Sequence, residues 1–186
     1  MAGPPPLDVE AGAALLREGG VLAYPTESCF GLGCDPRNQA AVERVLAAKG
    51  RAEAKGLILI GASWEHLAPY MGRLTVPMRR RMDRAWPGPV TFLVPPSAAV
   101  PPWVRGDHAR VALRWTAHPH AARLCKAFGG ALVSTSANRE GEPPARTAVQ
   151  CRETFGSALD GCLRGRVGPR RAPSAIIDAE TGCRHR

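Results

Sequence analysis

The feature that most constrains this chain is an alternation of short β-rich runs with stretches of helical periodicity. The helical pattern is clear in residues 8–18, where one face is apolar and Gly19-Gly20 follows as a stop. The strand pattern is clear in residues 57–60, a run of Leu and Ile. The alternation predicts an α/β fold with a twisted mixed sheet flanked by helices, in a single domain over residues 1–186.

Capping residues and turn residues locate further elements. Asn38 suits a helix N-cap, and Thr147 with Gln150 has the form of a capping box. Residues 94–110 form a link of hairpin length without a helix pattern, which favours antiparallel neighbours. The small, Pro-rich segment 1–7 is expected to be flexible. We expect helices at 8–18, 38–50, 63–67, 76–85, 119–128 and from 147, and strands at 21–24, 57–60, 90–94, 110–114, 131–133 and 174–178.

The chain is strongly basic, with 25 Lys and Arg against 16 Asp and Glu. Only three of the basic residues are lysines, Lys49, Lys55 and Lys126, so two lysines six positions apart are conspicuous. A basic surface favours a polyanionic partner such as RNA. A general preference for arginine explains the same charge equally well.

Composition also indicates in which cellular compartment the protein is expected. No apolar stretch approaches the roughly 20 residues that a membrane span needs, and the first residues lack the basic and apolar regions of a secretory signal. We therefore expect a cytoplasmic protein with no membrane contact. Its six cysteines form no Cys-x-x-Cys pair, so reduced thiols are expected and no metal ligands are assigned.

The common nucleotide-binding motifs do not occur. Lys55 lacks the neighbours of a Walker A lysine, and Gly31-Leu32-Gly33 is followed by Pro36 where a dinucleotide fingerprint needs a third Gly. Neither Gly-x-Ser-x-Gly nor His-Glu-x-x-His is present. A phosphate site in this chain therefore has to be built from other residues.

Residues 134–138, Ser-Thr-Ser-Ala-Asn, follow the apolar run 131–133 and precede Gly141 and two prolines. Hydroxyl and amide groups donate and accept hydrogen bonds without titrating, so a strand that ends in them is suited to bind carboxylate, hydroxyl or phosphate oxygens. The alternative is an ordinary loop whose Ser and Asn close turns.

Two other segments have a similar character. Residues 24–28 place a fixed proline and a polar cluster at a strand end, and the glycines of 30–33 permit close backbone approach. Lys49-Gly50-Arg51, with Lys55 beyond it, groups cations at a helix C-terminus. They are expected to be solvated and suit a triphosphate, although cations at this position also favour the helix dipole.

Taken together, these motifs resemble the YrdC family in the same order along the chain, from Gly20 to about Gly182. They are Tyr-Pro-Thr-Glu, Phe-Gly-Leu-Gly, Lys-x-Arg with Lys-Gly-Leu, Trp-Pro-Gly-Pro-Val-Thr, Val-Ala-Leu-Arg, Ser-Thr-Ser-Ala-Asn and Pro-Ser. The chain is similar to the short bacterial form, which lacks the extra C-terminal domain of longer relatives.

The resemblance implies a nucleotidyltransferase, an L-threonylcarbamoyladenylate synthase. Such an enzyme converts L-threonine, bicarbonate and ATP into threonylcarbamoyl-adenylate and pyrophosphate for tRNA modification, together with other tRNA threonylcarbamoylation proteins. Mg²⁺ is expected to enter with ATP. The alternatives are an RNA-binding or ribosome-assembly factor and a carbamoyl-transfer YrdC module of the hydrogenase-maturation type.

The resemblance also implies roles for individual residues. Two residues match the phosphate-binding signature and are taken as catalytic, namely Lys49 and Arg51. Seven match substrate-binding positions for threonine and ATP, namely Thr26, Lys55, Arg114, Ser134, Ser136, Asn138 and Ser174. Ser28 and Gly56 depart from the commoner Thr and Pro, and Glu27 receives no role.

Overall fold

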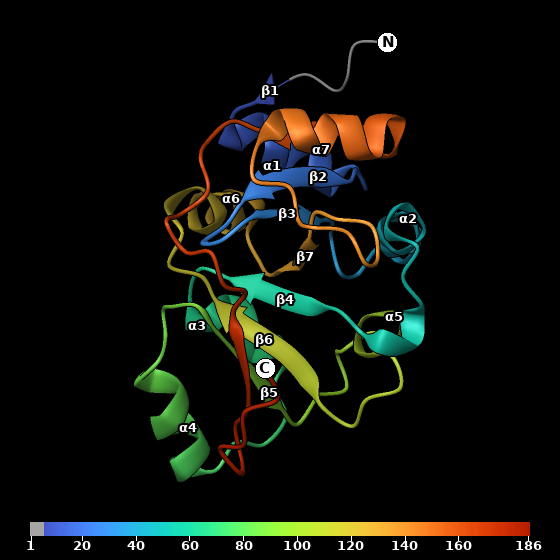
Figure 1. Cartoon of the computed structure of the whole chain (residues 1–186). Coiled ribbons are helices and arrows are strands. Elements are labelled where there is room, and N and C mark those ends of the chain that lie inside the picture. The colour runs from blue at the N-terminus through green and yellow to red at the C-terminus, as the bar shows by residue number, and fades with distance from the viewer. Residues whose placement is uncertain (1–5) are drawn as a thin grey trace.

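The computed structural model describes residues 6–186, and within them the chain forms one nine-stranded mixed sheet (Figure 1). The strand order is β1-β8-β2-β3-β7-β4-β6-β5-β9. The strands are β1 Pro6–Leu7, β2 Leu22–Pro25, β3 Phe30–Gly33, β4 Ile58–Gly61, β5 Val90–Val94, β6 Val111–Trp115, β7 Leu132–Ser136, β8 Gly161–Leu163 and β9 Ala175–Asp178.

The helices begin and end largely where the local chemistry predicts. Asn38 accepts a hydrogen bond from the Ala41 amide at 3.1 Å, and Gly50 closes the same helix with φ +64°. Thr147 and Gln150 form the predicted capping box. The α-helices are α1 Val9–Arg17, α2 Gln39–Lys49, α3 Trp64–Leu67, α4 Val76–Asp83, α5 Pro102–Arg105, α6 Pro119–Phe128 and α7 Ala148–Phe155, and 3-10 turns cover Glu53–Lys55, Ala68–Tyr70 and Gly156–Ala158.

Both faces of the sheet are apolar. Successive side chains in a strand point to opposite sides, and successive residues of the central strands are apolar. On one face Leu22 and Leu132 pack with α1 and α6. On the other, Ala23 and Val133 belong to a larger core that includes buried residues of α2, α4 and α7. Helices α1 and α6 cover the part of the first face near β2 and β8, and this leaves the β4, β6, β5 and β9 part of that face for a cavity.

Four features differ from the expectations, the first being strand β8, which was not predicted. Residues 30–33, for which no strand was predicted, form strand β3, which pairs with β2 and β7 because Gly33 allows the Val133 carbonyl to approach closely. The link at 94–110 contains the single-turn helix α5, although β5 and β6 are antiparallel as predicted. Residues 6–7 of the segment expected to be flexible pair with β8 as β1, and residues 1–5 lie outside the described part.

The predicted α/β architecture with a mixed sheet is confirmed. Antiparallel pairs such as β2–β3 and parallel pairs such as β4–β6 occur in the same sheet. Within residues 6–186 no helix combines the length and apolarity that a membrane crossing requires.

Candidate functional site

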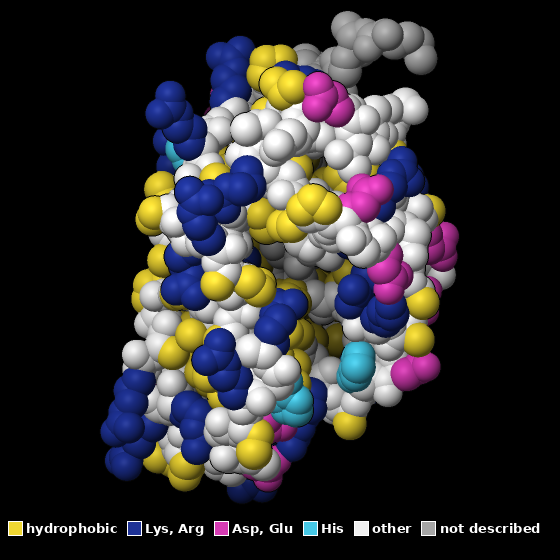
Figure 2. Space-filling model, viewed as in Figure 1, with side chains coloured by type: hydrophobic (Ala, Val, Ile, Leu, Met, Phe, Trp, Pro, Cys, Tyr) yellow, Lys and Arg dark blue, Asp and Glu magenta, His cyan; other side chains and the backbone are white. Residues whose placement is uncertain are grey.

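A cavity of about 490 Å³ lies over the part of the sheet that α1 and α6 leave open. Its floor consists of side chains that alternate with the core residues of their strands, such as Ile58, Ala112 and Leu93. In the space-filling view the molecule is hollowed at its centre, and basic side chains surround the hollow (Figure 2). The period of two along each strand thus places one set of side chains in the core and the next set at the cavity.

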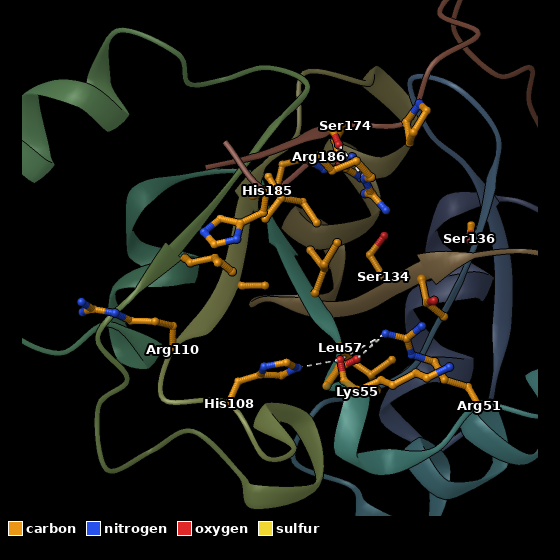
Figure 3. A pocket seen from close by; sticks show the side chains of 18 of the residues that line it. Arg51, Lys55, Leu57, His108, Arg110, Ser134, Ser136, Ser174, His185 and Arg186 are labelled. Carbon is orange, nitrogen blue, oxygen red and sulfur yellow. Dashed lines mark hydrogen bonds between the residues drawn. The ribbon is translucent and has the colours of Figure 1, made fainter. Parts of the chain in front are cut away.

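Seven of the nine predicted site residues line this cavity, although they come from distant parts of the sequence. Figure 3 shows Arg51 and Lys55 on one side of Ser134, and Ser174 on the other. The seven residues are Thr26, Arg51, Lys55, Arg114, Ser134, Ser136 and Ser174. The other two, Lys49 and Asn138, lie immediately behind Ser136.

Lys49 is buried, with 4% of its surface exposed, and its ammonium binds the loop that follows β7. It donates to the carbonyl oxygens of Ser136 and Asn138, the second at 2.8 Å, and to the Asn138 side-chain oxygen at 3.3 Å. Burial and the nearby positive charge of Arg51 lower the pKa of Lys49 to about 8. The expectation of a solvated cation was therefore wrong for Lys49, whose three donors all hold the loop.

Asn138 closes the same loop. Its side-chain nitrogen, Nδ2, donates to the carbonyl oxygens of Arg139 and Glu142 at 2.8 and 2.9 Å. Its side-chain oxygen accepts from the Ser136 hydroxyl at 2.5 Å. The turn-closing interpretation therefore describes Asn138, and a binding role for this run stays a prediction. Asn138 and Lys49 shape the loop, while Ser134 and Ser136 face the cavity.

Arg51 and Lys55 form the cationic wall. One Arg51 nitrogen donates to the carbonyls of Lys55 and Gly56 at 3.2 and 3.0 Å, whereas its buried Nε has no partner in the described residues. Lys55 pairs with Glu140 at the cavity rim, and both side chains are about half exposed. The pKa of the Glu140 carboxyl is lowered by this pairing. An exposed pair of this kind contributes little to stability, so Lys55 is available to a ligand.

Gly56 has a backbone conformation that proline cannot adopt. Its φ is +60°, whereas the proline ring holds φ near −65°. A Cβ atom here would lie 2.6 Å from the Arg105 carbonyl oxygen. Glycine in place of the commoner Pro therefore allows this backbone conformation. In it, the Gly56 carbonyl lies 3.0 Å from an Arg51 nitrogen.

The Arg114 side chain carries a nearly buried charge at the cavity. The residue is only 8% solvent-exposed, and its buried Nε has no hydrogen-bond partner within residues 6–186. Its nearest counter-charge is Glu27, with Nη2 and Oε2 3.7 Å apart. That distance permits an ion pair but is too long for a hydrogen bond. A buried guanidinium with free donors at a cavity wall is suited to bind an anion.

Hydroxyl groups also line the cavity, and some lie beside cations, as Ser174 lies beside Arg186. Thr26 is buried and donates to the Cys29 carbonyl at 2.7 Å, which leaves its oxygen able to accept. Ser174 lies 3.2 Å from the buried hydroxyl of Thr91. These groups offer neutral hydrogen-bonding partners next to Arg114, an arrangement suited to a polar ligand with one negative charge.

Sequence reasoning missed several lining residues. Arg110 only flanks the motif at residues 111–114, and the C-terminal residues reach the cavity through the pairing of their backbone with β9. Arg186 is an example: its backbone carbonyl accepts from Ile176 and its Nε donates to the Ser174 carbonyl at 3.2 Å. The other missed Arg and His residues are Arg105, His108, Arg110 and His185, and the missed hydroxyl residues are Ser28 and Thr135.

The cavity is positive overall. Six Lys or Arg side chains line it, and no Asp or Glu is among its lining residues in the described part of the chain. Partial burial together with the charges of Arg114 and Arg51 lowers the pKa of Arg186, because the three guanidinium groups repel one another. Such a cluster is stabilised by a polyanionic ligand. Across residues 6–186 there is no group of three or more His, Cys, Asp or Glu arranged to hold a metal ion.

The model of the Sua5/YciO/YrdC family, described as telomere recombination, matches residues 14–185. This chain belongs to the Sua5/YciO/YrdC family. The YrdC resemblance is thereby confirmed over nearly the whole chain. The family model does not by itself assign an activity, so individual relatives are informative.

Two relatives from this family carry the same name, threonylcarbamoyl-AMP synthase. The chain is 54% identical to the one from Nitrosococcus oceani over 178 residues, 96% of both chains. It is also 54% identical to the one from Thiobacillus denitrificans, over 91% of this chain and 89% of the relative.

A solved member of the family shares the fold. P. abyssi Sua5, crystallised with L-threonine, superposes with a TM-score of 0.86 at 32% identity over 91% of this chain. The chain spans about half the length of that Sua5 protein. The relationship to Sua5 therefore concerns the domain that the two chains share.

Proposed function

We propose that this YrdC-family protein is a threonylcarbamoyl-AMP synthase. The observation that carries the proposal is the cavity, in which six cations and a row of hydroxyls converge without a lining carboxylate. A polyanionic nucleotide and a small polar amino acid suit these two sets of groups. The relatives of that name, which match at 54% identity over nearly their full length, identify the reaction.

The chemistry requires alignment more than proton abstraction. Threonine's amine and bicarbonate first form a carbamate and release water. A carbamate oxygen then attacks the α-phosphorus of ATP, a new P–O bond forms, and the bond to the β-phosphate breaks so that pyrophosphate leaves. Because the nucleophile is already an anion, the site needs charge neutralisation and in-line geometry, which its Arg and Lys side chains supply.

The residues divide between the two substrates. Arg51 is assigned to the phosphates, and Lys49 fixes the loop that carries Ser136. The family resemblance places Lys55 near threonine, and its position beside Arg51 also allows it to contact the phosphates. Thr26, Ser174 and Arg114 form the pocket for threonine, with the guanidinium binding its carboxylate. The proposal thus places the carbamate between the cationic wall and these hydroxyl groups.

Mg²⁺ enters, on this proposal, as part of the MgATP substrate. Magnesium retains several waters and is commonly held by substrate phosphates with few protein ligands. The lining of this cavity offers cations and hydroxyls, so the phosphates of ATP would be its ligands here.

Pyrophosphate release tests the assignment. Purified protein with MgATP and bicarbonate should release pyrophosphate only when L-threonine is added. Release with carbamoyl phosphate in place of threonine and bicarbonate would favour the carbamoyl-transfer alternative. No release with either, together with RNA binding, would favour the RNA-binding or ribosome-assembly alternative.

A basic surface surrounds the cavity and is available to RNA, including tRNA. Figure 2 shows separate groups of Lys and Arg side chains on this face. If they contact nucleic acid, the contacts are with phosphates, so affinity should fall steeply with added salt. Salt-independent binding, or none at low salt, would remove RNA and tRNA from the list of direct partners.

A further inference from the structure

Glu27 carries a buried carboxylate that neither the motifs nor the cavity lining explain. Only 9% of its surface is exposed, and it is not among the residues that line the cavity. It sits in the short connection between β2 and β3, directly after Thr26. A carboxylate is rarely buried without a specific partner, because removing the charge from water is costly.

One oxygen of this carboxylate is fully held by the chain after β6. Glu27 Oε1 accepts from the Thr116 hydroxyl at 2.8 Å and from the Ala117 amide at 3.1 Å. The other oxygen, Oε2, has no hydrogen-bond partner in the described residues and faces Arg114 at 3.7 Å. The hydrogen bonds therefore aim a free negative oxygen at the Arg114 guanidinium.

The charge state of the pair agrees with this geometry. Burial alone would raise the pKa of the Glu27 carboxyl, but Arg114 and the hydrogen bonds to Oε1 hold that pKa below its usual value. Glu27 is thus an anion at neutral pH. Its charge compensates the buried guanidinium without occupying the guanidinium's hydrogen-bond donors.

The segment after β8 seals Glu27 from solvent. The Gly168 amide donates to the Thr26 carbonyl at 2.9 Å, and a Cβ at Gly168 would lie 2.6 Å from the Glu27 carbonyl oxygen. The backbone of Glu27 is therefore fixed on this side while its carboxylate is fixed on the other. Little freedom remains for Glu27 to move away from Arg114.

We propose that Glu27 is a positioning residue that holds Arg114 at the cavity wall with its donors directed toward the carboxylate of the amino-acid substrate. The proposal rests on the proposed function, in which that amino acid is threonine. Glu27 acts through Arg114 and touches no substrate. An arginine whose counter-ion lies behind it, at ion-pair distance, keeps its planar fork free for a bidentate contact in front.

Glu27→Gln tests this proposal, because the amide keeps the shape and an oxygen for Thr116 and Ala117 but removes the charge that faces Arg114. We expect the Kd for L-threonine, measured calorimetrically, and the KM for threonine to rise about 10- to 100-fold, the range that follows from a displaced positioning group. The KM for ATP should stay near its wild-type value. A purely structural role would lower the active fraction and leave both constants unchanged.

Asp160→Asn is the matched control. Asp160 also accepts from a backbone amide, that of Val21 at 2.7 Å, and pairs with an arginine, Arg44, at 2.8 Å. Neither Asp160 nor Arg44 lines the cavity. This variant should bind threonine as the wild type does. Equal weakening by the control would attribute the Glu27→Gln effect to a general loss of structure and overturn the proposal.

Coupling to Arg114 distinguishes positioning from other effects. Since Glu27 acts through Arg114, adding Glu27→Gln to Arg114→Ala should weaken threonine binding little further, whereas independent roles would give additive losses and overturn the proposal. If Glu27→Gln does not fold, Thr116→Val removes one hydrogen bond to Oε1 and should raise the same two constants to a smaller extent. Wild-type affinity in either folded variant contradicts the inference, whereas a wild type without threonine-dependent pyrophosphate release contradicts the proposed function itself.

Discussion

The ammonium nitrogen of Lys49 lies 2.8 Å from the carbonyl oxygen of Asn138, and the two residues are 89 positions apart in the sequence. This contact joins the end of α2 to the loop that follows β7. The loop carries Ser136, whose side chain faces the cavity. A cation that was expected to be solvated is therefore part of the frame of the site.

Replacing Lys49 with Met should destabilise the protein as well as inactivate it. The substitution removes the Lys49 donor from the part-buried Asn138 carbonyl, whereas the Ser136 carbonyl keeps its hydrogen bond from the Asn138 amide at 2.9 Å. An unsatisfied buried group costs about 1–3 kcal/mol, and partial exposure places the expected loss at the lower end of that range. Chemical denaturation measures the loss, and pyrophosphate release measures activity. A variant as stable as the wild type would show that the loop does not depend on this contact.

The stability contributed by Lys49 should depend on pH. Its pKa of about 8 lies below the ordinary lysine value of 10.5, so the folded state releases its proton first. The cost of burying the charge is present below about pH 8 and is relieved as pH rises from about 8 toward 10.5. The unfolding free energy of the wild type relative to Lys49→Met should therefore rise across that interval. A constant difference would indicate an unshifted lysine.

Arg51→Ala should lose ATP turnover while the protein stays folded. Arg51 is half-buried and donates to the carbonyls of exposed Lys55 and buried Gly56, so stability should fall by about 1 kcal/mol, the typical net contribution of a hydrogen bond. Comparison of the melting temperature with threonine-dependent pyrophosphate release separates the two effects. Full turnover in a folded variant would remove Arg51 from the phosphate site.

Valine should be rejected much more strongly than serine. Valine matches the shape of threonine but would leave hydroxyl groups such as Thr26 and Ser134 without a partner, whereas serine lacks only a methyl group. We expect kcat/KM for serine to be about 10- to 200-fold below that for threonine, and that for valine to be lower still. If valine performed as well as serine, the pocket would recognise shape and not the hydroxyl.

Neither histidine at the cavity should be an essential base. His108 and His185 both line the cavity, but an anionic carbamate needs no proton removed when it attacks phosphorus. Substitution of either by Gln should leave the rate within about tenfold, less than a lost general base usually costs. A hundredfold loss at one of them would require a base in the mechanism.

Local sequence was sufficient to predict most of the helices and to recognise the motifs that the chain shares with the YrdC family. Caps such as Asn38 and Thr147 form hydrogen bonds within three residues, so the helix starts can be predicted without knowledge of the tertiary structure. The apolar runs 90–94 and 110–114 likewise predicted β5 and β6 closely. Candidate site residues could be named for the same reason, since Lys-x-Arg and Ser-Thr-Ser-Ala-Asn are contiguous, and their roles stay predictions.

Tertiary structure decided what each of these residues does. Strand β3 has two glycines among its four residues and weak local preference for a strand, yet it lies between β2 and β7 because its glycines allow close packing. Glu27 finds Arg114, and Arg186 reaches the cavity, only after distant strands pair. The sequence alone determined which chemical groups are available and where helices start and stop, because those depend on near neighbours. Burial, charge compensation and the convergence of cations and hydroxyls on one cavity depend on contacts between distant residues, so only the folded sheet determined them.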